Sequence, residues 1–248
     1  MARFPAATAR IGILVPAFNS STQPEMEAMR VRGVSNHVAR IDMPNTPLTS
    51  DANQAEVVAQ IGPDLPAAIR RVSAVAPNAI ILGISIGSFW RGVAGGRALR
   101  EELQQQCDVP FVTADDALLE ALGHLPEVRR LGLITPFQPA ANERIRAFFT
   151  EAGFTVDMIH STNATSGLSI ADLPEEGIIA AIKKVAASDC DAVLQVGTNL
   201  ATAQLMDEGE RWLGKPCLSV NAALYWRALR LCGVETPLEG FGSVFARF

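Results

Sequence analysis

The sequence predicts an α/β protein with two similar Rossmann-like halves, each a four-stranded parallel sheet flanked by helices. Eight short apolar runs rich in β-branched residues recur along the chain, and each is followed by ten or more residues of helical periodicity. Strands that alternate with helices form mostly parallel sheets covered on both faces. The last four runs also resemble the first four, which predicts a division into two halves.

The expected strands, in chain order, are Arg10–Val15, Val34–Ile41, Ala79–Gly83, Phe111–Thr113, Leu131–Thr135, Phe154–Ile159, Ala192–Val196 and Cys217–Val220. A helix over Asp115–His124 is expected near the boundary between the halves. The last helix, Asn221–Cys232, is expected to cross back toward the first half. The predicted halves are therefore residues 1–120 with 221–248, and residues 121–220.

An internal repeat supports the two halves. Ile11–Pro16 reads IGILVP and Leu131–Pro136 reads LGLITP, and the segment from Ile80 to Ser85 is similar to the segment from Leu194 to Asn199. Val109–Leu118 is likewise similar to Lys215–Leu224. Strand and helix segments also resemble one another through composition alone, but a duplication explains the order of all these matches.

Composition excludes several classes of protein. With 48% hydrophobic and 19% charged residues among 248, the chain is neither disordered nor fibrous. The net charge is −5 and the basic residues are scattered, so no nucleic-acid partner is expected. No apolar run is long enough to span a membrane, and the start of the chain has no secretory cleavage site. We therefore expect a cytoplasmic protein without a membrane partner.

The cysteines indicate neither zinc nor a disulfide framework. None of the four belongs to a CxxC pair or to a metal-binding Cys/His spacing, so in a reducing compartment they are predicted to be free thiols. They are Cys107, Cys190, Cys217 and Cys232.

Ligands of open parallel sheets bind beyond the carboxyl ends of the strands. Two such sheets that face each other would enclose one site, with walls formed by Pro16–Asn19, Gly83–Gly87, Thr135–Phe137 and Gly197–Asn199. Glycine at a strand-to-helix turn lets the backbone approach a ligand, and the unpaired N–H groups there suit a carboxylate or a phosphate. A nucleotide is disfavoured because no Walker or GxGxxG sequence is present.

At these segments the chain resembles the aspartate/glutamate racemase superfamily, in the branch of maleate cis-trans isomerases and arylmalonate decarboxylases. Gly83–Gly92 and Gly240–Phe245 resemble the decarboxylases, whereas Val15–Asn19 together with Asn163 resembles the isomerases. The resemblance extends from Ile11 to Phe245. It implies two pseudo-symmetric halves, a homo-oligomer, no metal and no organic cofactor, and a small carboxylic-acid substrate held by backbone amides.

The chain departs from the family pattern at four positions. The resemblance places the family's two catalytic cysteines at Gly83 and Gly197, so both thiols are missing. A family tyrosine is replaced by Phe137, which cannot donate a hydrogen bond, and a threonine of the decarboxylase is replaced by Ile84. Burial is the expected role of the four existing cysteines, so none is expected to substitute for the missing ones.

The candidate catalytic residues are therefore hydroxyls and one histidine at predicted strand ends: Ser85, Thr198 and His160. The candidate substrate-binding residues are Asn19, Gly83, Ile84, Ile86, Phe137, Asn163, Gly197 and Asn199.

The expected function is that of a lyase or isomerase that acts on a small carboxylic or dicarboxylic acid through a carbanion or enediolate. A carboxylate-binding sensor that has lost catalysis is the main alternative, because the pocket is retained while the usual thiols are absent. A minor alternative is a hydrolase, since Gly83–Gly87 matches GxSxG around Ser85. His160, however, precedes the place expected for a late catalytic histidine.

Overall fold

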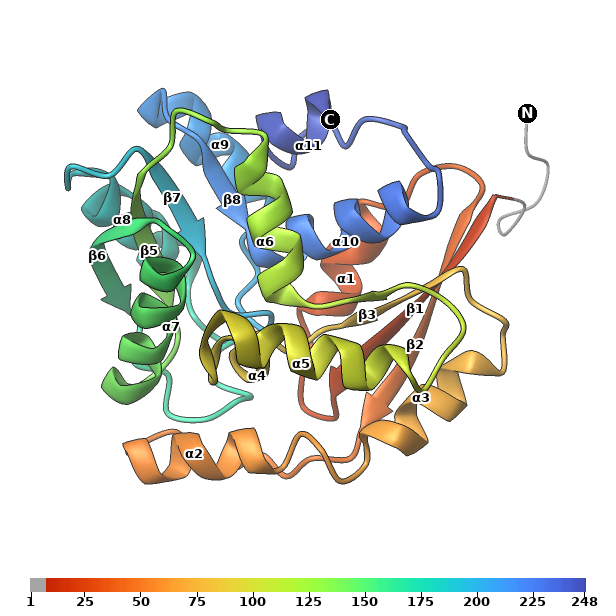
Figure 1. Ribbon diagram of the computed structural model, residues 1–248. Coiled ribbons are helices and arrows are strands. Elements are labelled where there is room, and N and C mark those ends of the chain that lie inside the picture. The colour runs from red at the N-terminus through yellow and green to blue at the C-terminus, as the bar shows by residue number, and fades with distance from the viewer. Residues whose placement is uncertain (1–7) are drawn as a thin grey trace.

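The computed structural model describes residues 8–248 and has two four-stranded parallel sheets, as the sequence predicts (Figure 1). The first has the order β2-β1-β3-β4 and the second the order β6-β5-β7-β8. The start of the chain, where no signal sequence is predicted, lies in part outside the described residues. The strands are β1 (Ala9–Pro16), β2 (Val34–Ile41), β3 (Ala79–Leu82), β4 (Phe111–Val112), β5 (Arg130–Thr135), β6 (Thr155–Ser161), β7 (Ala192–Gln195) and β8 (Cys217–Ser219).

Helices connect the strands and cover the sheets (Figure 1). Val220 begins α10 and does not extend β8, and the predicted last helix is followed by the short α11. The helices are α1 (Thr22–Ala28), α2 (Asp51–Ala59), α3 (Leu65–Ser73), α4 (Ile86–Phe89), α5 (Gly92–Gln104), α6 (Ala114–Gly123), α7 (Pro139–Glu151), α8 (Glu175–Ala186), α9 (Ala203–Leu213), α10 (Val220–Leu231) and α11 (Ser243–Arg247). No helix among residues 8–248 combines the length and the apolar character that a membrane span requires.

The two halves repeat the same local interactions. The backbone N–H of Asn78 donates to the Arg10 carbonyl over 2.7 Å, and the N–H of Arg10 returns a bond to the Asn78 side chain over 2.9 Å. In the second half the N–H of Asp191 donates to the Arg130 carbonyl, and the N–H of Arg130 donates to the Asp191 side chain, both over 2.7 Å. Each pair joins the start of the first strand of a half to the start of its third strand.

The strand register corrects one part of the sequence repeat. Ile80 lies opposite Gly12 in the first sheet, and Val193 lies opposite the equivalent Gly132 in the second. Ile80 therefore corresponds to Val193 and not to Leu194, so the sequence match between these strands is shifted by one residue. In the corrected register Ser85 and Thr198 occupy equivalent places, because Ser85 follows Ile80 by five residues and Thr198 follows Val193 by five.

The apolar core runs through both halves. The central strands are buried on both faces, which explains their continuous apolar sequences. Helix α10 carries the fully buried Tyr225 and Trp226 and packs against α1, α6 and β3. Buried Tyr225 keeps its hydroxyl paired, because it donates to Asn36 Oδ1 over 2.9 Å. The domain boundaries proposed from the sequence stay a prediction.

The connection between β2 and β3 crosses from the first half to the second. Pro47 forms an isolated antiparallel bridge with Ser166, and the N–H of Leu48 donates to the Thr165 carbonyl over 2.7 Å. Asp51, at the start of α2, accepts a bond from the N–H of Ala140 over 2.9 Å. Helix α2 consequently packs against α7 of the second half, at the bottom of the view in Figure 1.

We predict that Asp191→Ala destabilises the protein at pH 7 and has little effect in acid. Hydrogen bonds from the backbone N–H groups of Arg129 and Arg130 hold the pKa of Asp191 below its ordinary value. The stabilisation is therefore fully present above the pKa of the unfolded chain, about 3.9, and is lost as the pH falls through the lower folded pKa.

Urea unfolding at pH 7 and at a pH below the folded pKa of Asp191 measures this difference. Asp189→Ala is the matched control, because the Asp189 side chain is 87% exposed and lies 3.7 Å from Arg130; we expect a small change at either pH. A destabilisation by Asp191→Ala that is the same at both pH values would contradict the prediction.

Candidate active site

A partly enclosed cavity of about 50 Å³ lies where the carboxyl ends of the two sheets meet. It is formed by the loops after the central strands β1, β3, β5 and β7, and it is covered by the segment through α2 and by residues 167–170. The residues that line it are Pro16, Phe18, Asn19, Met43, Leu48, Gln54, Val57, Ile84, Ser85, Ile86, Phe137, Gly167, Ile170, Gly197, Thr198 and Asn199. All four loops predicted as walls contribute to it.

Direct hydrogen bonds hold the two halves together at this cavity. Thr198 Oγ1 donates to the Gly83 carbonyl over 2.9 Å, which joins the loop after β7 to the end of β3. The Thr198 carbonyl in turn accepts bonds of 2.9 Å from Thr22 Oγ1 and from Asn221 Nδ2. Thr198 is therefore fixed by its side chain and by its backbone.

Two asparagines fix the loop after β1. Asn199 Oδ1 accepts the N–H groups of Ser20 and Ser21 at 2.9 and 3.1 Å, and Asn199 Nδ2 donates to the Gly167 carbonyl over 2.7 Å. Asn19 Oδ1 accepts the N–H groups of Ser21 and Thr22 at 3.2 and 3.0 Å. These donors determine which end of the Asn19 amide is the oxygen, so its Nδ2 is the end left unpaired.

Several hydrogen-bond donors at the cavity have no protein partner. The backbone N–H groups of Ser85, Thr198 and Asn199 make no hydrogen bond within residues 8–248, and the Ser85 hydroxyl makes none either. Asn19 Nδ2 is buried and is likewise unpaired. Buried polar groups normally find partners, so this concentration of free donors indicates a place for an acceptor such as a carboxylate.

The cavity carries no charge. No Asp, Glu, Lys, Arg or His lies among the described residues that line it. Glu25 lies behind the Thr198 loop, where it accepts bonds of 2.6 Å from the N–H of Ala203 and 2.7 Å from Asn221 Nδ2. Desolvation raises the pKa of Glu25, against the lowering effect of these two bonds. A bound anion would thus be held by neutral dipoles.

Two other predicted residues lie apart from the cavity. His160 is near the end of β6, an edge strand, and desolvation, followed by repulsion from Lys184, lowers its pKa. Asn163 is exposed and has a left-handed backbone with φ of 50°. The roles proposed for them stay predictions. The hydrolase alternative finds no support, because no described histidine lines the cavity beside Ser85.

The backbone at Gly83 and Gly197 is closely packed. A Cβ atom at Gly83 would lie 2.8 Å from the Leu14 carbonyl oxygen, and one at Gly197 would lie 2.6 Å from Pro136 Cδ. A side chain at either position requires its neighbours to move. The absence of thiols at these two places thus agrees with how the surrounding residues pack.

The four cysteines lie away from the cavity. Desolvation raises the pKa of Cys217 to about 12 and that of Cys232 to about 11, and it also raises the pKa of Cys107. Cys190 is buried beside the start of β7. A reactive thiol needs a lowered pKa and access, so these cysteines fit packing roles.

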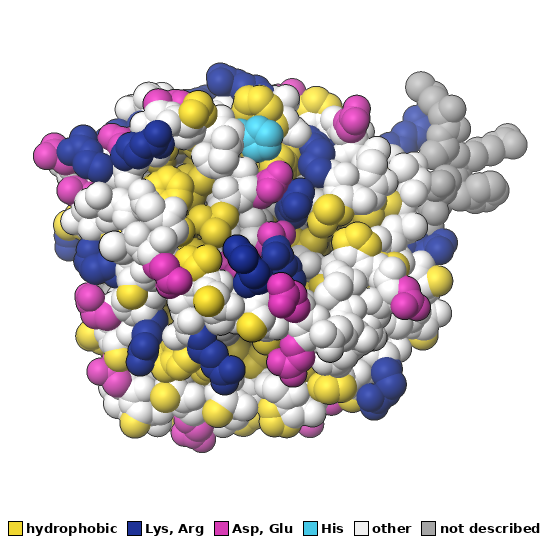
Figure 2. All heavy atoms as spheres, viewed as in Figure 1, with side chains coloured by type: hydrophobic (Ala, Val, Ile, Leu, Met, Phe, Trp, Pro, Cys, Tyr) yellow, Lys and Arg dark blue, Asp and Glu magenta, His cyan; other side chains and the backbone are white. Residues whose placement is uncertain are grey.

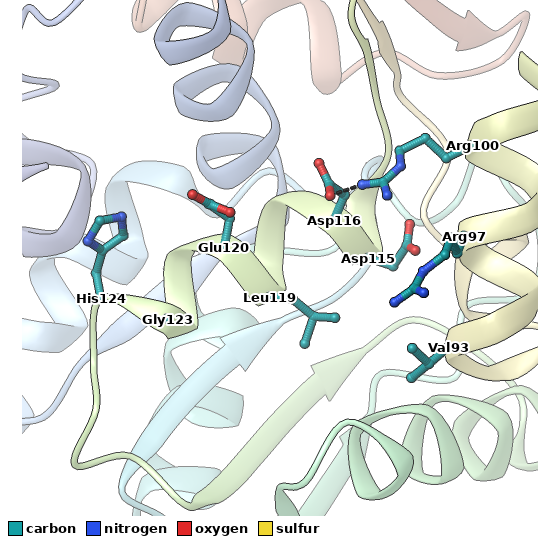
Figure 3. A pocket seen from close by; sticks show the side chains of 9 residues that line it. All are labelled: Val93, Arg97, Arg100, Asp115, Asp116, Leu119, Glu120, Gly123 and His124. Carbon is teal, nitrogen blue, oxygen red and sulfur yellow. Dashed lines mark hydrogen bonds and ion pairs between the residues drawn. The ribbon is translucent and has the colours of Figure 1, made fainter. Parts of the chain in front are cut away.

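A second hollow lies between α5 and α6 and is strongly charged (Figure 3). Arg100 binds Asp116 in this hollow, and Arg227, which lies beside it, is 3.6 Å from Asp116 and 3.5 Å from Glu120. On the face seen in Figure 2, acidic and basic side chains are likewise interspersed. The free donors of the enclosed cavity make it the stronger candidate for the active site.

Sequence reasoning missed the residues that cover the cavity. Met43, Leu48, Gln54 and Val57 come from the segment through α2, and Ile170 comes from the loop after β6. No motif identifies them, and the first four reach the cavity only through the crossing of the β2–β3 connection to the second half.

The fold and the cavity define an α/β protein with one enclosed site between two Rossmann-like halves. The chain belongs to the arylmalonate decarboxylase family, because the family model matches residues 11–245. This is a family of cofactor-independent enzymes that include lyases and isomerases.

Three comparisons with known proteins illustrate the match. The chain is 31% identical over 168 residues to the arylmalonate decarboxylase of Bordetella bronchiseptica, which covers 66% of this chain and 69% of that protein. It is 24% identical over 242 residues to the maleate isomerase of Nocardia farcinica, and this match covers 95% of this chain and 94% of that protein. The structure of the Nocardia farcinica maleate cis-trans isomerase bound to TRIS superposes with a TM-score of 0.87 at 22% identity, over 96% of this chain and 98% of that one.

We predict that iodoacetamide at pH 8 labels the cysteines of the folded protein slowly. Cys217 is fully buried, and the raised pKa values of Cys107, Cys217 and Cys232 leave little thiolate at this pH. Mass spectrometry measures the labelling over time, and the urea-unfolded protein, in which all four should react, is the control. Rapid labelling of one cysteine before unfolding would identify a reactive thiol and contradict this assignment.

Proposed function

We propose that the protein is a cofactor-independent enzyme that cleaves a bond next to a carboxylate in a small acid, most directly by decarboxylation. The observation that supports this is the cluster of unpaired donors in an enclosed, uncharged cavity: the N–H groups of Ser85, Thr198 and Asn199, and Asn19 Nδ2. Such a cluster suits a carboxylate whose charge increases during the reaction.

In this proposal the backbone donors bind the carboxylate that the substrate retains. The bond to the departing carboxyl carbon breaks, carbon dioxide leaves, and the electron pair passes into the retained carboxylate as an enediolate. Negative charge then grows on the oxygens that face the N–H groups. Preorganised donors of this kind contribute on the order of 3 kcal/mol each to transition-state stabilisation.

The apolar wall favours loss of the second carboxylate. Ile84, Phe137 and Leu48 line the cavity and offer no polar partner to an ionised group. A carboxylate placed against them is poorly solvated, whereas carbon dioxide is neutral and apolar. Decarboxylation therefore relieves an unfavourable burial of charge.

The carbanion then takes a proton, and Ser85 is the group that we place in this role. Its hydroxyl faces the cavity without a hydrogen-bond partner within residues 8–248. Water restores the serine proton afterwards. Thr198 acts differently, as a positioning residue, because its hydroxyl proton is engaged by the Gly83 carbonyl.

Proton NMR in D₂O tests the reaction class. The purified protein is incubated with substituted malonates, maleate and amino dicarboxylates, and product signals and deuterium at the α-carbon are followed. Decarboxylation or exchange of any member supports carbanion chemistry. Binding without turnover across the whole panel would contradict the proposal and favour a carboxylate sensor.

We predict that Ser85→Ala lowers kcat by about 10²- to 10⁴-fold for an acid that turns over, with little change in KM, because a positioned acid contributes an effect of this size. Ser88→Ala is the control, since the buried Ser88 hydroxyl donates to the Ser85 carbonyl over 2.8 Å but does not line the cavity. Steady-state kinetics on folded protein separates kcat from KM. A Ser85→Ala variant with the parent kcat would exclude Ser85 as the proton donor.

A further inference from the structure

Gln54 is placed in the cavity in a way that the proposed reaction does not explain. It is the one residue of α2 that is fully buried, with 0% of its surface exposed. Val57 and Val58 of the same helix stay half-buried. A helix normally turns its apolar residues inward, so burial of a glutamine here in preference to the valines indicates a specific use for its amide.

The Gln54 amide is unpaired within the part of the chain that the structure describes. Both Nε2 and Oε1 are buried without a hydrogen bond to any of residues 8–248. Gln60, six positions along the chain, shows the ordinary arrangement, because its Oε1 accepts from Thr46 Oγ1 over 3.0 Å and its Nε2 donates to Glu56 over 3.1 Å. An unpaired buried donor and acceptor destabilise the folded protein, so Gln54 is best explained by a partner that enters the cavity.

The surroundings of Gln54 define the chemistry of that partner. Other residues of the cover are apolar, including Met43, Leu48 and Ile170. The free donors that suit a carboxylate belong to Asn19 and to the loops after β3 and β7. Gln54 therefore supplies a separate polar contact, on the segment that closes the cavity.

We infer that Gln54 is a specificity-determining residue, and that the substrate carries, beyond the retained and departing carboxylates of the proposed reaction, a neutral group that both donates and accepts hydrogen bonds, such as a carboxamide or a hydroxyl. Such a group pairs with Nε2 and Oε1 together. An alkyl or aryl group beside Gln54 leaves both atoms unpaired. A carboxylate beside Gln54 accepts only, which leaves Oε1 unpaired, and no described cation lines the cavity to balance its charge.

This inference rests on the proposed function, because it assumes that the cavity binds a carboxylate. Binding is measured by isothermal titration calorimetry with three probes of similar shape: succinamate, which ends in a carboxamide, 4-methylpentanoate, which ends in an apolar group, and succinate, which ends in a charge. Turnover is not needed for this measurement, so it is independent of the reaction.

We expect the parent protein to bind succinamate about 10-fold or more tightly than 4-methylpentanoate, and more tightly than succinate, because a site built to pair a polar group rejects analogues that lack it. Gln54→Leu should abolish the preference over 4-methylpentanoate. The same variant should also raise the urea midpoint of the unliganded protein, since it removes two unpaired buried atoms without changing the side-chain volume greatly.

Gln60→Leu is the matched control. It removes a glutamine whose amide is paired and which does not line the cavity, so we expect a lower urea midpoint and the parent order of affinities. A role of Gln54 in folding alone would instead lower the urea midpoint of Gln54→Leu and leave the order of affinities unchanged.

Equal affinity of the parent for succinamate and 4-methylpentanoate, or a preference that survives in Gln54→Leu, would overturn the inference while leaving the carboxylate site intact. Failure of all three probes to bind would contradict the carboxylate site of the proposed function, and the inference with it. The pattern across the probes thus separates the two failures.

Discussion

The hydrogen bond from Thr198 Oγ1 to the Gly83 carbonyl is the contact on which the site depends. It joins the two sheets at their carboxyl ends, so the loops of both halves share one cavity. Gly83 is also closely packed within its own half, because a Cβ there would lie 2.8 Å from the Leu14 carbonyl oxygen. Thr22 and Asn221 add two further bonds to the Thr198 carbonyl. With the Thr198 backbone held by these bonds, its N–H and that of Asn199 remain free to face a ligand.

The absence of charged side chains at the described cavity wall has a chemical consequence. In the proposed reaction the substrate is already an anion, so an arginine would bind substrate and transition state with similar strength. Unpaired N–H groups beside the retained carboxylate would instead favour the state in which charge has moved onto it. The apolar residues Ile84 and Phe137 would leave the departing carboxylate of the proposed substrate poorly solvated. Phe137 thus fits the cavity as a wall, although it cannot donate the hydrogen bond of the tyrosine expected at its position.

The sequence predicts the strands and the walls of the site well because both follow from local patterns. Apolar runs mark the buried strands, and the rule for parallel sheets places Ser85 and Thr198 at one edge. His160 lies near the carboxyl end of its strand but does not line the cavity, because β6 is the outermost strand of its sheet, a position that depends on strand order and not on local sequence. Gln54 could not be found for a similar reason. Its burial depends on α2 crossing to the second half, and an amide in a polar helix such as DANQAEVVA is ordinarily exposed.

The corrected register shows how the two candidate hydroxyls, those of Ser85 and Thr198, differ. Ser85 and Thr198 occupy equivalent places in the two halves, yet their hydroxyls have different surroundings. The Thr198 hydroxyl bonds the opposite half, whereas the Ser85 hydroxyl has no partner in the described chain. A duplicated fold supplies both hydroxyls at once, but the bond between the halves uses only one of them. The asymmetry of that bond leaves one free hydroxyl among the described residues that line the cavity, which suits the single proton delivery of the proposed reaction.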